Sequence, residues 1–516
     1  MNGKLISKIL GKIMILEGIL MILPLIVSLV YKEYQKGIKY ILAFLIPILI
    51  LIVVGYLLQL LKPERKGLYQ KEGFAICALV WIIMTLFGAL PFVINGDIPN
   101  YIDALFETMS GLTTTGASII NWDITSLSKS SLFWRSFTHW IGGMGILVFI
   151  LIFIPESDDG SSLHLLKAES PGPQVGKLAS KMKVTTRILY LIYFAMTIIE
   201  IILLLFTGDT IGPDGTVYEF GLFESLLASF GSAGTGGFGF FPGSMEFITP
   251  YAQYVIATFL ILFGINFSLY FLLIIGKVKE VFKSEELKTY LLVIFSAVAL
   301  ICMNIIINIY NGIQNITGAD FEYIFRHAYF QVASIITTTG YSSINYEYWP
   351  EFSKTIIIIL MLFGAMAGST GGGIKISRIV IAFKSGFAKI KKLINPRYIV
   401  KTKFEGKVLD ETTSNDVFAF ITMYFVIAFI VILILSFDPI NGTITIDNMK
   451  HGFTSNFTAT ISCLSNIGPG FETVGPYGSF ASYSYFSKII LTLTMLIGRL
   501  EILPVLILFT PKTWRK

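Results

Sequence analysis

Long apolar runs, each bounded by charged or polar residues, recur along the whole chain. Ten of these runs are long enough to cross a lipid bilayer as helices, because about 20 helical residues span its hydrocarbon core. They cover residues 6–31, 38–61, 73–95, 131–154, 187–207, 251–275, 289–310, 354–383, 416–436 and 485–509. The pattern therefore predicts an all-α polytopic membrane protein that lies in a lipid bilayer.

Four shorter apolar stretches lie between the predicted spans, and each is followed by a polar loop that contains glycine. Each stretch has about 12 residues, too few to cross a bilayer, so we expect half-helices that return through an extended loop. The loops read TTTGAS (113–118), SAGTGGFG (232–239), TTTGYSS (337–343) and SNIGPGFE (465–472). Aligned on one glycine each, they pair Thr115-Gly116, Thr235-Gly236, Thr339-Gly340 and Ile467-Gly468.

These half-helices give the chain a fourfold internal repeat. Each unit reads span, short helix, glycine loop, span, and the aligned glycines are 120, 104 and 128 residues apart. Repetition on this scale indicates that equivalent units pack against one another. We expect two N-terminal spans in residues 1–66, followed by four repeats of this unit around one axis. The repeats cover residues 67–160, 161–283, 284–405 and 406–516.

The distribution of basic residues predicts how the chain lies in the membrane. The segments expected to be cytoplasmic hold 27 Lys and Arg residues, and those expected to be outside hold 6. Since basic residues favour the cytoplasmic side, both termini are predicted to be cytoplasmic, although Lys32, Lys36 and Lys39 lie in an outer loop. The formal charge of +6 then reflects the cytoplasmic loops, and no nucleic-acid partner is expected.

The four loops have the composition of a cation filter. Loops arranged about one axis would present carbonyl oxygens that replace the hydration shell of an alkali cation. Glycine adopts positive φ without a Cβ penalty, and threonine adds a hydroxyl and a stiff side chain. A single such loop is usually a simple turn, but four matched loops indicate a filter. The candidate K+-binding residues are Thr114, Thr115, Gly116, Gly234, Thr235, Gly236, Thr338, Thr339, Gly340, Asn466, Ile467 and Gly468.

Several other motifs carry no function in this context. Residues 234–239 match G-x-G-x-x-G, but a dinucleotide site needs a strand before the motif and a helix after it. GSTGGGIK (368–375) is not a Walker A loop, because Ile374 separates Gly373 from Lys375. The histidines lack metal-ligand spacing, the three cysteines suit no disulfide framework, and no catalytic nucleophile with a base is visible. We expect neither a bound nucleotide nor an enzymatic activity.

Two features of the later spans suggest that the passage of ions past the filter is controlled. Residues 364–374 contain five glycines and a Ser-Thr pair, which a stable helix does not tolerate. The apolar run either ends there in a cytoplasmic loop, or breaks beneath the filter and forms a gate. The candidate gate residues are Gly371, Gly372, Gly373, Lys375 and Arg499.

The arginine of this set lies between apolar residues, where an ionisable group usually faces a cavity or a partner. Arg499 either repels cations in the path or binds carbonyls of the broken helix, and the two roles are compatible. Four acidic residues also lie near apolar segments and are interpreted as interfacial or helix-capping groups. They are Glu17, Glu107, Glu200 and Glu224.

Four longer motifs are HWIGGMGILVF (139–149), LLKAESPGP (165–173), AGSTGGGIKISR (367–378) and GRLEILPVLILFTP (498–511). They resemble the Trk/Ktr/HKT potassium-transporter superfamily, and the two extra N-terminal spans resemble its TrkH/TrkG branch. The resemblance implies a K+-channel-like, pseudo-fourfold pore built from four M1-P-M2 pore repeats. It also implies a homodimer and a cytosolic TrkA-like RCK subunit that binds nucleotide. It also implies that Gly116, Gly236, Gly340 and Gly468 are selectivity glycines, that residues 371–373 form the gating loop, and that Arg499 is the pore arginine.

Together these observations predict K+ uptake across the bacterial inner membrane through a gated, K+-selective pore under cytosolic control. The alternative is a K+ symporter coupled to Na+ or H+, although the sequence shows no clear proton relay. An intramembrane enzyme would need catalytic groups within the spans, and a scaffold protein would not explain four matched loops.

Overall fold

The computed structural model describes residues 2–62, 69–121, 123–145, 182–212, 215–310, 316–397, 402–437, 452–502 and 505. Helices make up most of this part of the chain. Its strands form two antiparallel hairpins, β1 (Thr210–Ile211) with β2 (Val217–Tyr218) and β3 (Lys403–Phe404) with β4 (Lys407–Val408). The motif LLKAESPGP at 165–173 lies outside the described residues.

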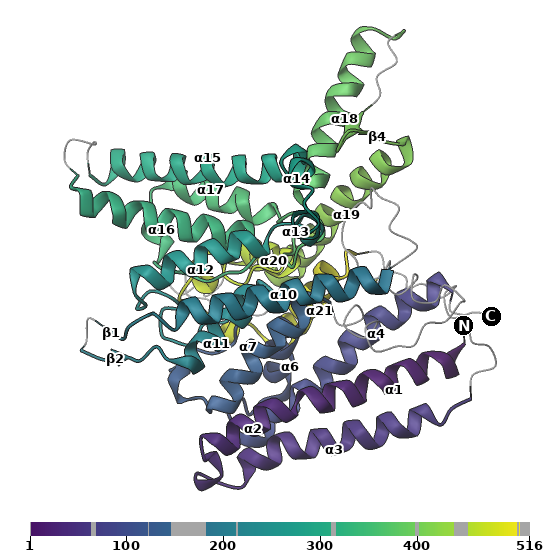
Figure 1. The fold of residues 1–516 in the computed structure, drawn as a ribbon, viewed down its shortest axis with the longest axis vertical. Helices are drawn as coiled ribbons and strands as arrows, with labels where there is room; N and C mark the ends of the chain where they lie inside the picture. The colour runs from purple at the N-terminus through teal and green to yellow at the C-terminus, as the bar shows by residue number, and fades with distance from the viewer. Residues whose placement is uncertain are drawn as a thin grey trace.

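Figure 1 shows long helices packed side by side with nearly parallel axes, as expected for a bundle that crosses a bilayer. Six helical stretches among the described residues are long and apolar enough to span a membrane, which confirms the helical polytopic class. They are Gly3–Val30, Lys39–Gln59, Glu72–Asn95, Thr186–Leu204, Glu285–Asn308 and Glu411–Ser436.

These stretches correspond to six of the ten predicted spans. The helices within them are α1 (Gly3–Leu20), α2 (Ile22–Val30), α3 (Lys39–Gln59), α4 (Gln70–Gly88), α5 (Leu90–Asn95), α10 (Met182–Leu204), α15 (Glu285–Asn308) and α19 (Glu411–Ser436). Two further predicted spans begin as expected, in α7 (Lys129–Gly143) and α21 (Tyr485–Arg499), and the chain soon after each is outside the described residues.

Two predicted spans are interrupted. The span predicted at 251–275 consists of two helices, α12 (Pro250–Phe263) and α13 (Phe267–Ile274), which meet at 90°. The predicted break at 364–374 is present: residues 363–375 separate α17 (Glu351–Leu362) from α18 (Ile376–Ile394). Beyond it α18 projects away from the bundle (Figure 1).

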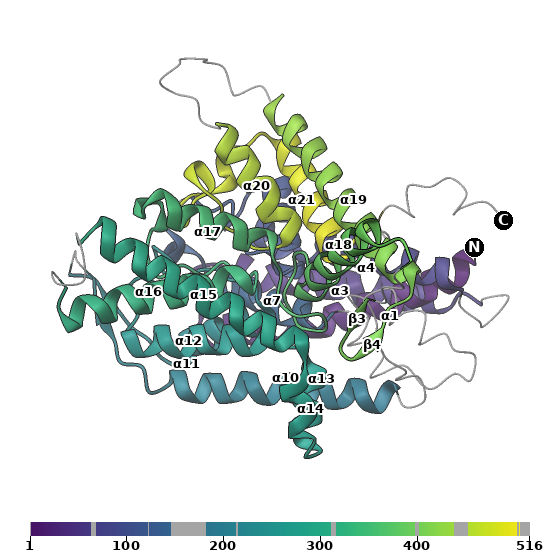
Figure 2. The same cartoon turned by 90° about the horizontal axis from the view of Figure 1, so that it is seen from above.

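All four predicted half-helices are present: α6 (Tyr101–Leu112), α11 (Leu222–Gly234), α16 (Gly318–Ile336) and α20 (Phe453–Ser465). α16 is longer than expected, at 19 residues, because a Thr317–Asp320 capping box starts it early. Each half-helix lies between two outer helices in chain order, and Figure 2 shows α19, α20 and α21 grouped on one side. The remaining elements are α14 (Val278–Lys283) and short 3-10 helices at Glu33–Gln35, Ile124–Ser126, Tyr346–Tyr348, Glu472–Val474 and Phe480–Ser482.

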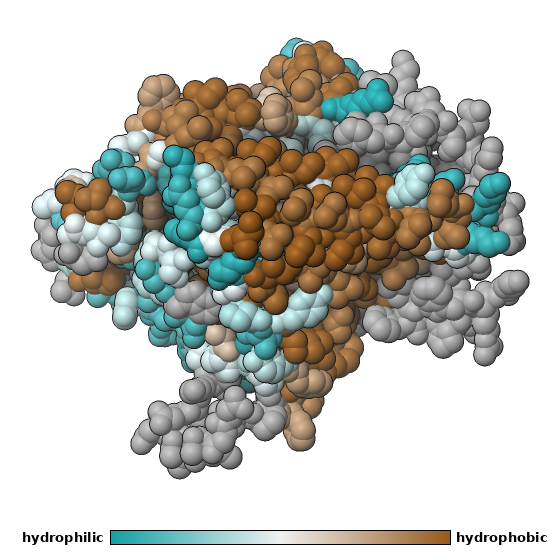
Figure 3. All heavy atoms as spheres, turned by 90° about the horizontal axis from the view of Figure 1, so that it is seen from below, coloured by the Kyte–Doolittle hydropathy of each residue, from teal (hydrophilic) through white to brown (hydrophobic). Residues whose placement is uncertain are grey.

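The outer helices expose apolar side chains, as lipid-facing helices do. Leu49, Val53 and Leu57 of α3 are all more than half exposed, as are Leu191 and Phe194 of α10. Figure 3 shows a broad hydrophobic surface across one face of the molecule. An exposed patch of this extent in water would mark an interface, whereas in a bilayer it faces the hydrocarbon chains.

The N-terminal pair of helices is held by a close crossing of α1 and α3. A Cβ on Gly11 would lie 2.7 Å from the carbonyl oxygen of Gly55, and a Cβ on Gly55 would lie 2.6 Å from that of Gly11. Small residues allow membrane helices to approach this closely, so that van der Waals contact drives their association.

We therefore expect Gly55→Val to force α1 and α3 apart and to destabilise the protein by about 1–3 kcal/mol, the usual cost of overpacking. Gly18→Ala is the matched control on the same crossing, because its Cβ would meet its nearest neighbour at 3.4 Å. Thermal unfolding in detergent measures both variants. Equal unfolding midpoints for the two would show that the glycine contact does not set the packing.

Candidate functional site

The four glycine loops share one backbone conformation. Each begins, directly after its half-helix or one residue later, with a non-glycine residue in the left-handed region: Thr114 (φ 55), Thr235 (φ 54), Thr338 (φ 57) and Asn466 (φ 56). Two residues later each loop has a glycine with positive φ: Gly116, Gly237, Gly340 and Gly468. The residue between them donates its N–H to the carbonyl five residues earlier, at 2.8–2.9 Å: Thr115, Gly236, Thr339 and Ile467.

This comparison corrects the predicted register of the second loop. The sequence alignment placed Gly236 with the other three glycines, whereas the backbone places Gly237 there and pairs Gly236 with Thr115, Thr339 and Ile467. The Thr-Gly-Gly sequence offers two candidates. Alignment on a Thr-Gly pair selected the first, since only the backbone conformation distinguishes them.

The four aligned glycines close a ring. A Cβ on any of them would meet the carbonyl oxygen of the next loop: Gly116 that of Gly236, Gly237 that of Thr339, Gly340 that of Ile467, and Gly468 that of Thr115. The contacts run from loop one to two, three and four and back to one. The loops therefore surround a single axis, so closely that none of these positions has room for a side chain.

The threonine hydroxyls brace the loops. The Oγ1 atoms of Thr115 and Thr113 are 2.8 Å apart, and those of Thr339 and Thr337 are also 2.8 Å apart. Asn466 Nδ2 donates to Thr115 Oγ1 at 2.9 Å, which joins the fourth loop to the first. The threonine pairs therefore brace the first and third loops from within, whereas the asparagine ties the fourth loop to the first.

A buried ion pair supports the first two loops from behind. Arg135 of α7 contacts Glu107 of α6 at 2.7 Å, and both side chains are almost fully buried. Glu107 also accepts from Ile119 N at 3.0 Å, and Arg135 donates to the Gly239 carbonyl at 3.1 Å. The interpretation of Glu107 as an interfacial or capping residue was therefore wrong, because partners distant in sequence neutralise its charge.

His139 also joins loops one and two. Its Nδ1 lies 2.8 Å from the Gly111 carbonyl oxygen, and its Nε2 accepts from Phe238 N at 3.3 Å. These partners require a proton on Nδ1 and none on Nε2. A Cβ on Gly234 or Gly236 would overlap this histidine. Both glycines therefore make room for His139, and neither belongs to the aligned set.

The other acidic residues differ among themselves. Glu224 caps the start of α11, as expected, and pairs with Lys129 at 3.3 Å. Glu17 and Glu200 are fully buried, and within the described part of the chain neither forms an ion pair. Their interpretation as interfacial residues was wrong, because side-chain burial depends on tertiary packing.

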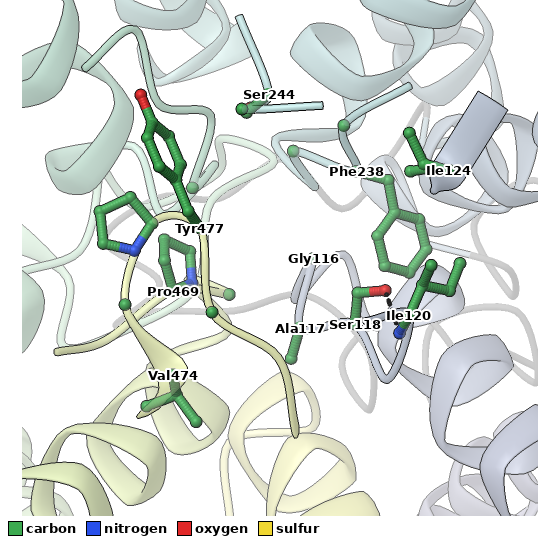
Figure 4. Close-up of a pocket in the computed structure, with 18 of the residues that line it drawn as sticks. Gly116, Ala117, Ser118, Ile120, Ile124, Phe238, Ser244, Pro469, Val474 and Tyr477 are labelled. Atoms are coloured by element: carbon green, nitrogen blue, oxygen red, sulfur yellow. Dashed lines mark hydrogen bonds between the residues drawn. The ribbon is translucent and has the colours of Figure 1, made fainter. Parts of the chain in front are cut away.

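A cavity of about 300 Å³ opens on one side of the ring. All four aligned glycines line it, together with side chains such as Phe238, Pro469 and Tyr477 (Figure 4). Gly236 does not line it, which agrees with the corrected register. Asp123 and Arg135 supply its charged groups.

Residues 363–375 lie against the opposite side of the ring. A Cβ on Gly371 would lie 2.9 Å from the Thr337 carbonyl oxygen, and one on Gly372 would meet Ser465 and Asn466. Gly372 N donates to Thr338 Oγ1 at 2.6 Å. Gly364 N donates to the Ile374 carbonyl at 2.6 Å, so the segment folds back on itself. The alternative of a cytoplasmic loop starting at this point was therefore wrong.

Arg499 joins this segment to the first loop. It donates to Thr114 Oγ1 at 3.2 Å, to the Thr370 carbonyl at 2.8 Å, and to the Gly142 and Gly143 carbonyls at the end of α7. Lys375 is buried and donates to the Gly371 carbonyl. The predicted gate residues thus lie together directly beneath the ring, and Arg499 brings positive charge to it.

The comparisons with known proteins agree with this architecture. A family model described as "TrkH: Cation transport protein" matches residues 41–516. The Trk system potassium uptake protein TrkH of Escherichia coli K12 is 31% identical over 525 residues, with full coverage of both chains. TrkG of the same organism is 29% identical over 517 residues and 99% of each chain.

A solved structure is similar as well. The crystal structure of the potassium transporter TrkH from Vibrio parahaemolyticus covers all of both chains, with a TM-score of 0.82 and 28% identity. The family match extends over nearly the whole chain, including all four half-helices and their loops. The chain belongs to the TrkH family of cation transport proteins.

Proposed function

We propose that this protein takes up K+ through a gated, K+-selective pore whose filter is the ring of four glycine loops. The observation that carries the proposal is the closed series of contacts from each glycine to a carbonyl oxygen of the next loop. The relatives are named as potassium uptake proteins and a potassium transporter, which supports K+ as the ion.

Main-chain carbonyl oxygens in such a ring replace the water around a K+ ion. The half-helices end at the loops, so the negative ends of their dipoles favour a cation there. In this proposal the ion binds to the loop backbone at Thr114, Thr115, Gly116, Thr235, Gly236, Gly237, Thr338, Thr339, Gly340, Asn466, Ile467 and Gly468. Gly234 is left out because it is the last residue of the half-helix α11 and precedes the loop.

We assign gating to residues 363–375 and Arg499. The segment contacts the third and fourth loops, and Arg499 contacts the first. The arrangement corresponds to a closed path, and K+ would pass when Gly371, Gly372 and Gly373 withdraw from beneath the ring. The positive charge of Arg499 adds an electrostatic barrier in that closed state.

The location and the partners of the chain belong to the same proposal. The excess of Lys and Arg in one set of loops supports cytoplasmic termini in a bacterial inner membrane. We also include in this proposal a homodimer and a cytosolic TrkA-like RCK subunit that binds nucleotide, for which the family resemblance is the support. The repeat boundaries predicted from the sequence remain part of this proposal.

A K+ symporter is the second candidate. Glu17 and Glu200 are fully buried carboxyl groups, and Glu200 lies next to Ser232 of the half-helix α11. A buried carboxyl without an ion-pair partner is a candidate proton-binding group. Dependence of K+ flux on a proton gradient, abolished by Glu200→Gln, would favour this candidate over a passive pore.

The filter assignment predicts that one added hydroxymethyl group at Gly116 lowers the selectivity for K+ over Na+. Gly116→Ser places a Cβ against the Gly236 carbonyl and strains a residue with φ of 77°, so the ring must open. We expect the K+/Na+ flux ratio in proteoliposomes to fall by about tenfold, equivalent to about 1.4 kcal/mol of selectivity. Gly208→Ala is the control, because nothing lies within 4 Å of its Cβ. Equal K+ and Na+ fluxes in the wild type would contradict the proposal.

The corrected register of loop two gives a separate prediction. Gly237→Ser should lower the K+/Na+ flux ratio as Gly116→Ser does, because its Cβ would strike the Thr339 carbonyl. Gly236→Ser should instead displace His139 and lower the unfolding midpoint. The same flux assay, run beside thermal unfolding, separates the two. A loss of selectivity only in Gly236→Ser would favour the sequence-based alignment.

The two possible roles of Arg499 predict different outcomes for conservative changes. Arg499→Gln removes the charge, so a barrier role predicts K+ flux raised by about tenfold, the effect of about 1.4 kcal/mol. Arg499→Lys keeps the charge, but its single ammonium group cannot donate to all four acceptors of the guanidinium. It should therefore lower the thermal stability and leave the K+ flux near that of the wild type. If both variants behave alike in flux, the role of Arg499 is structural.

A further inference from the structure

The break between α12 and α13 meets the break between α17 and α18. Gly264 and Asn266 form the elbow, which bends the chain by 90°. A Cβ on Gly264 would strike the Tyr290 hydroxyl and lie 2.9 Å from Thr337 Cγ2, so only glycine fits this turn. Asn266 starts α13 by accepting a hydrogen bond from Ser268 N at 2.9 Å.

Backbone groups that lose their helical hydrogen bonds at one break find hydrogen-bond partners at the other. Met366 N donates to the Gly264 carbonyl at 3.1 Å, and Phe267 N donates to the Gly368 carbonyl at 3.1 Å. The side chain of Asn266 packs on Gly368, where a Cβ would lie 3.0 Å from its Oδ1. Since unpaired backbone groups are costly inside a membrane, these bonds hold residues 366–368 against the elbow.

A second contact holds the same segment from the start of α15. Glu286 Oε1 accepts from Ala367 N at 2.8 Å and from Ser377 N at 3.1 Å. The Glu286 side chain is almost fully buried. One carboxylate oxygen thus binds the backbone on both sides of residues 370–373, the part that lies beneath the ring.

The two contacts belong to one stretch of chain. α13 and α14 connect the elbow to Glu286, and much of this connection is exposed, including Val278 and Phe282 of α14. A displacement of α13 and α14 would therefore move both contacts at once. At the tip of residues 363–375, Thr370 Oγ1 donates to the Phe263 carbonyl, directly before the elbow, at 3.4 Å. The other neighbours of residues 370–372 include the glycine loops and Arg499.

We propose that the elbow and Glu286 form a clamp that holds the base of residues 363–375 and sets how readily their tip leaves the ring. Glu286 and Asn266 are positioning residues, since they act on the path through the segment. The proposal rests on the gating role given above to this segment. It adds the control of that gate through the connection of α13 and α14.

The first test compares two changes at Glu286. Glu286→Ala removes the acceptor of two N–H groups, the buried one of Ser377 and the partly buried one of Ala367. Glu286→Gln keeps a side-chain oxygen in place. We expect Glu286→Ala to raise hydrogen exchange in peptides covering residues 363–377, and to raise K+ flux about tenfold, the effect of about 1.4 kcal/mol. Glu286→Gln should resemble the wild type in both, and the K+/Na+ flux ratio should not change.

Hydrogen exchange separates the clamp from the gate. Unchanged exchange in Glu286→Ala would overturn the clamp. Raised exchange with unchanged K+ flux would leave the clamp standing and contradict the gating role of the segment. A merely structural role for Glu286 predicts raised exchange throughout the protein and a reduced K+/Na+ flux ratio, which would also overturn the proposal.

The second test locks the elbow to the segment. Asn266→Cys combined with Gly368→Cys places two sulfurs within bonding reach, because a Cβ on Gly368 would lie 3.2 Å from Asn266 Cγ. Oxidation should lower K+ flux at least about tenfold, and a reductant should restore it. The wild type, whose Cys77, Cys302 and Cys463 are all buried, is the oxidation control. Failure of the disulfide to form, or full flux through the oxidised protein, would overturn the clamp.

Discussion

A peptide group that leaves a helix inside a membrane must find another hydrogen-bond partner or a polar path, because lipid offers neither. Four loops of this chain leave their helices in the interior of the protein, and each glycine Cα packs on a carbonyl of the next loop. The ring closes only if all four loops adopt the same turn. This requirement explains the four left-handed residues, the four positive-φ glycines and the shared hydrogen bond between them.

The protein around the ring supplies charge and rigidity to hold it. The Glu107–Arg135 pair, His139 and Asn466 each join two loops. Their partners are main-chain groups or buried side chains. Each contact therefore fixes the position of a loop as well as stabilising the protein. In the proposed filter, such placement is needed so that the carbonyl oxygens replace water around the ion.

The other side of the ring is built from broken helices. The breaks at residues 264–266 and 363–375 are paired, so that carbonyl and N–H groups of one satisfy those of the other. Each break therefore supplies hydrogen-bond partners to backbone groups that have left a helix in the other. The charged groups of Arg499, Lys375 and Glu286 are all bonded to backbone atoms of this region.

The sequence by itself determined the class of the protein, its half-helices and the position of its second break, because apolar periodicity and glycine content are local properties. It also located the four loops, since they repeat. It did not distinguish Gly236 from Gly237, because adjacent glycines differ only in the conformation that neighbouring loops impose.

Tertiary structure decided what depends on partners distant along the chain. The bend after α12 arises within an apolar run and is stabilised by the break between α17 and α18 about a hundred residues later, so its local sequence shows only Gly264 and Asn266. Glu107 resembles a surface acid until Arg135 is placed beside it. Burial, ion pairing and ring closure depend on contacts between repeats. The sequence shows which residues are present for such contacts, but not which of them lie together.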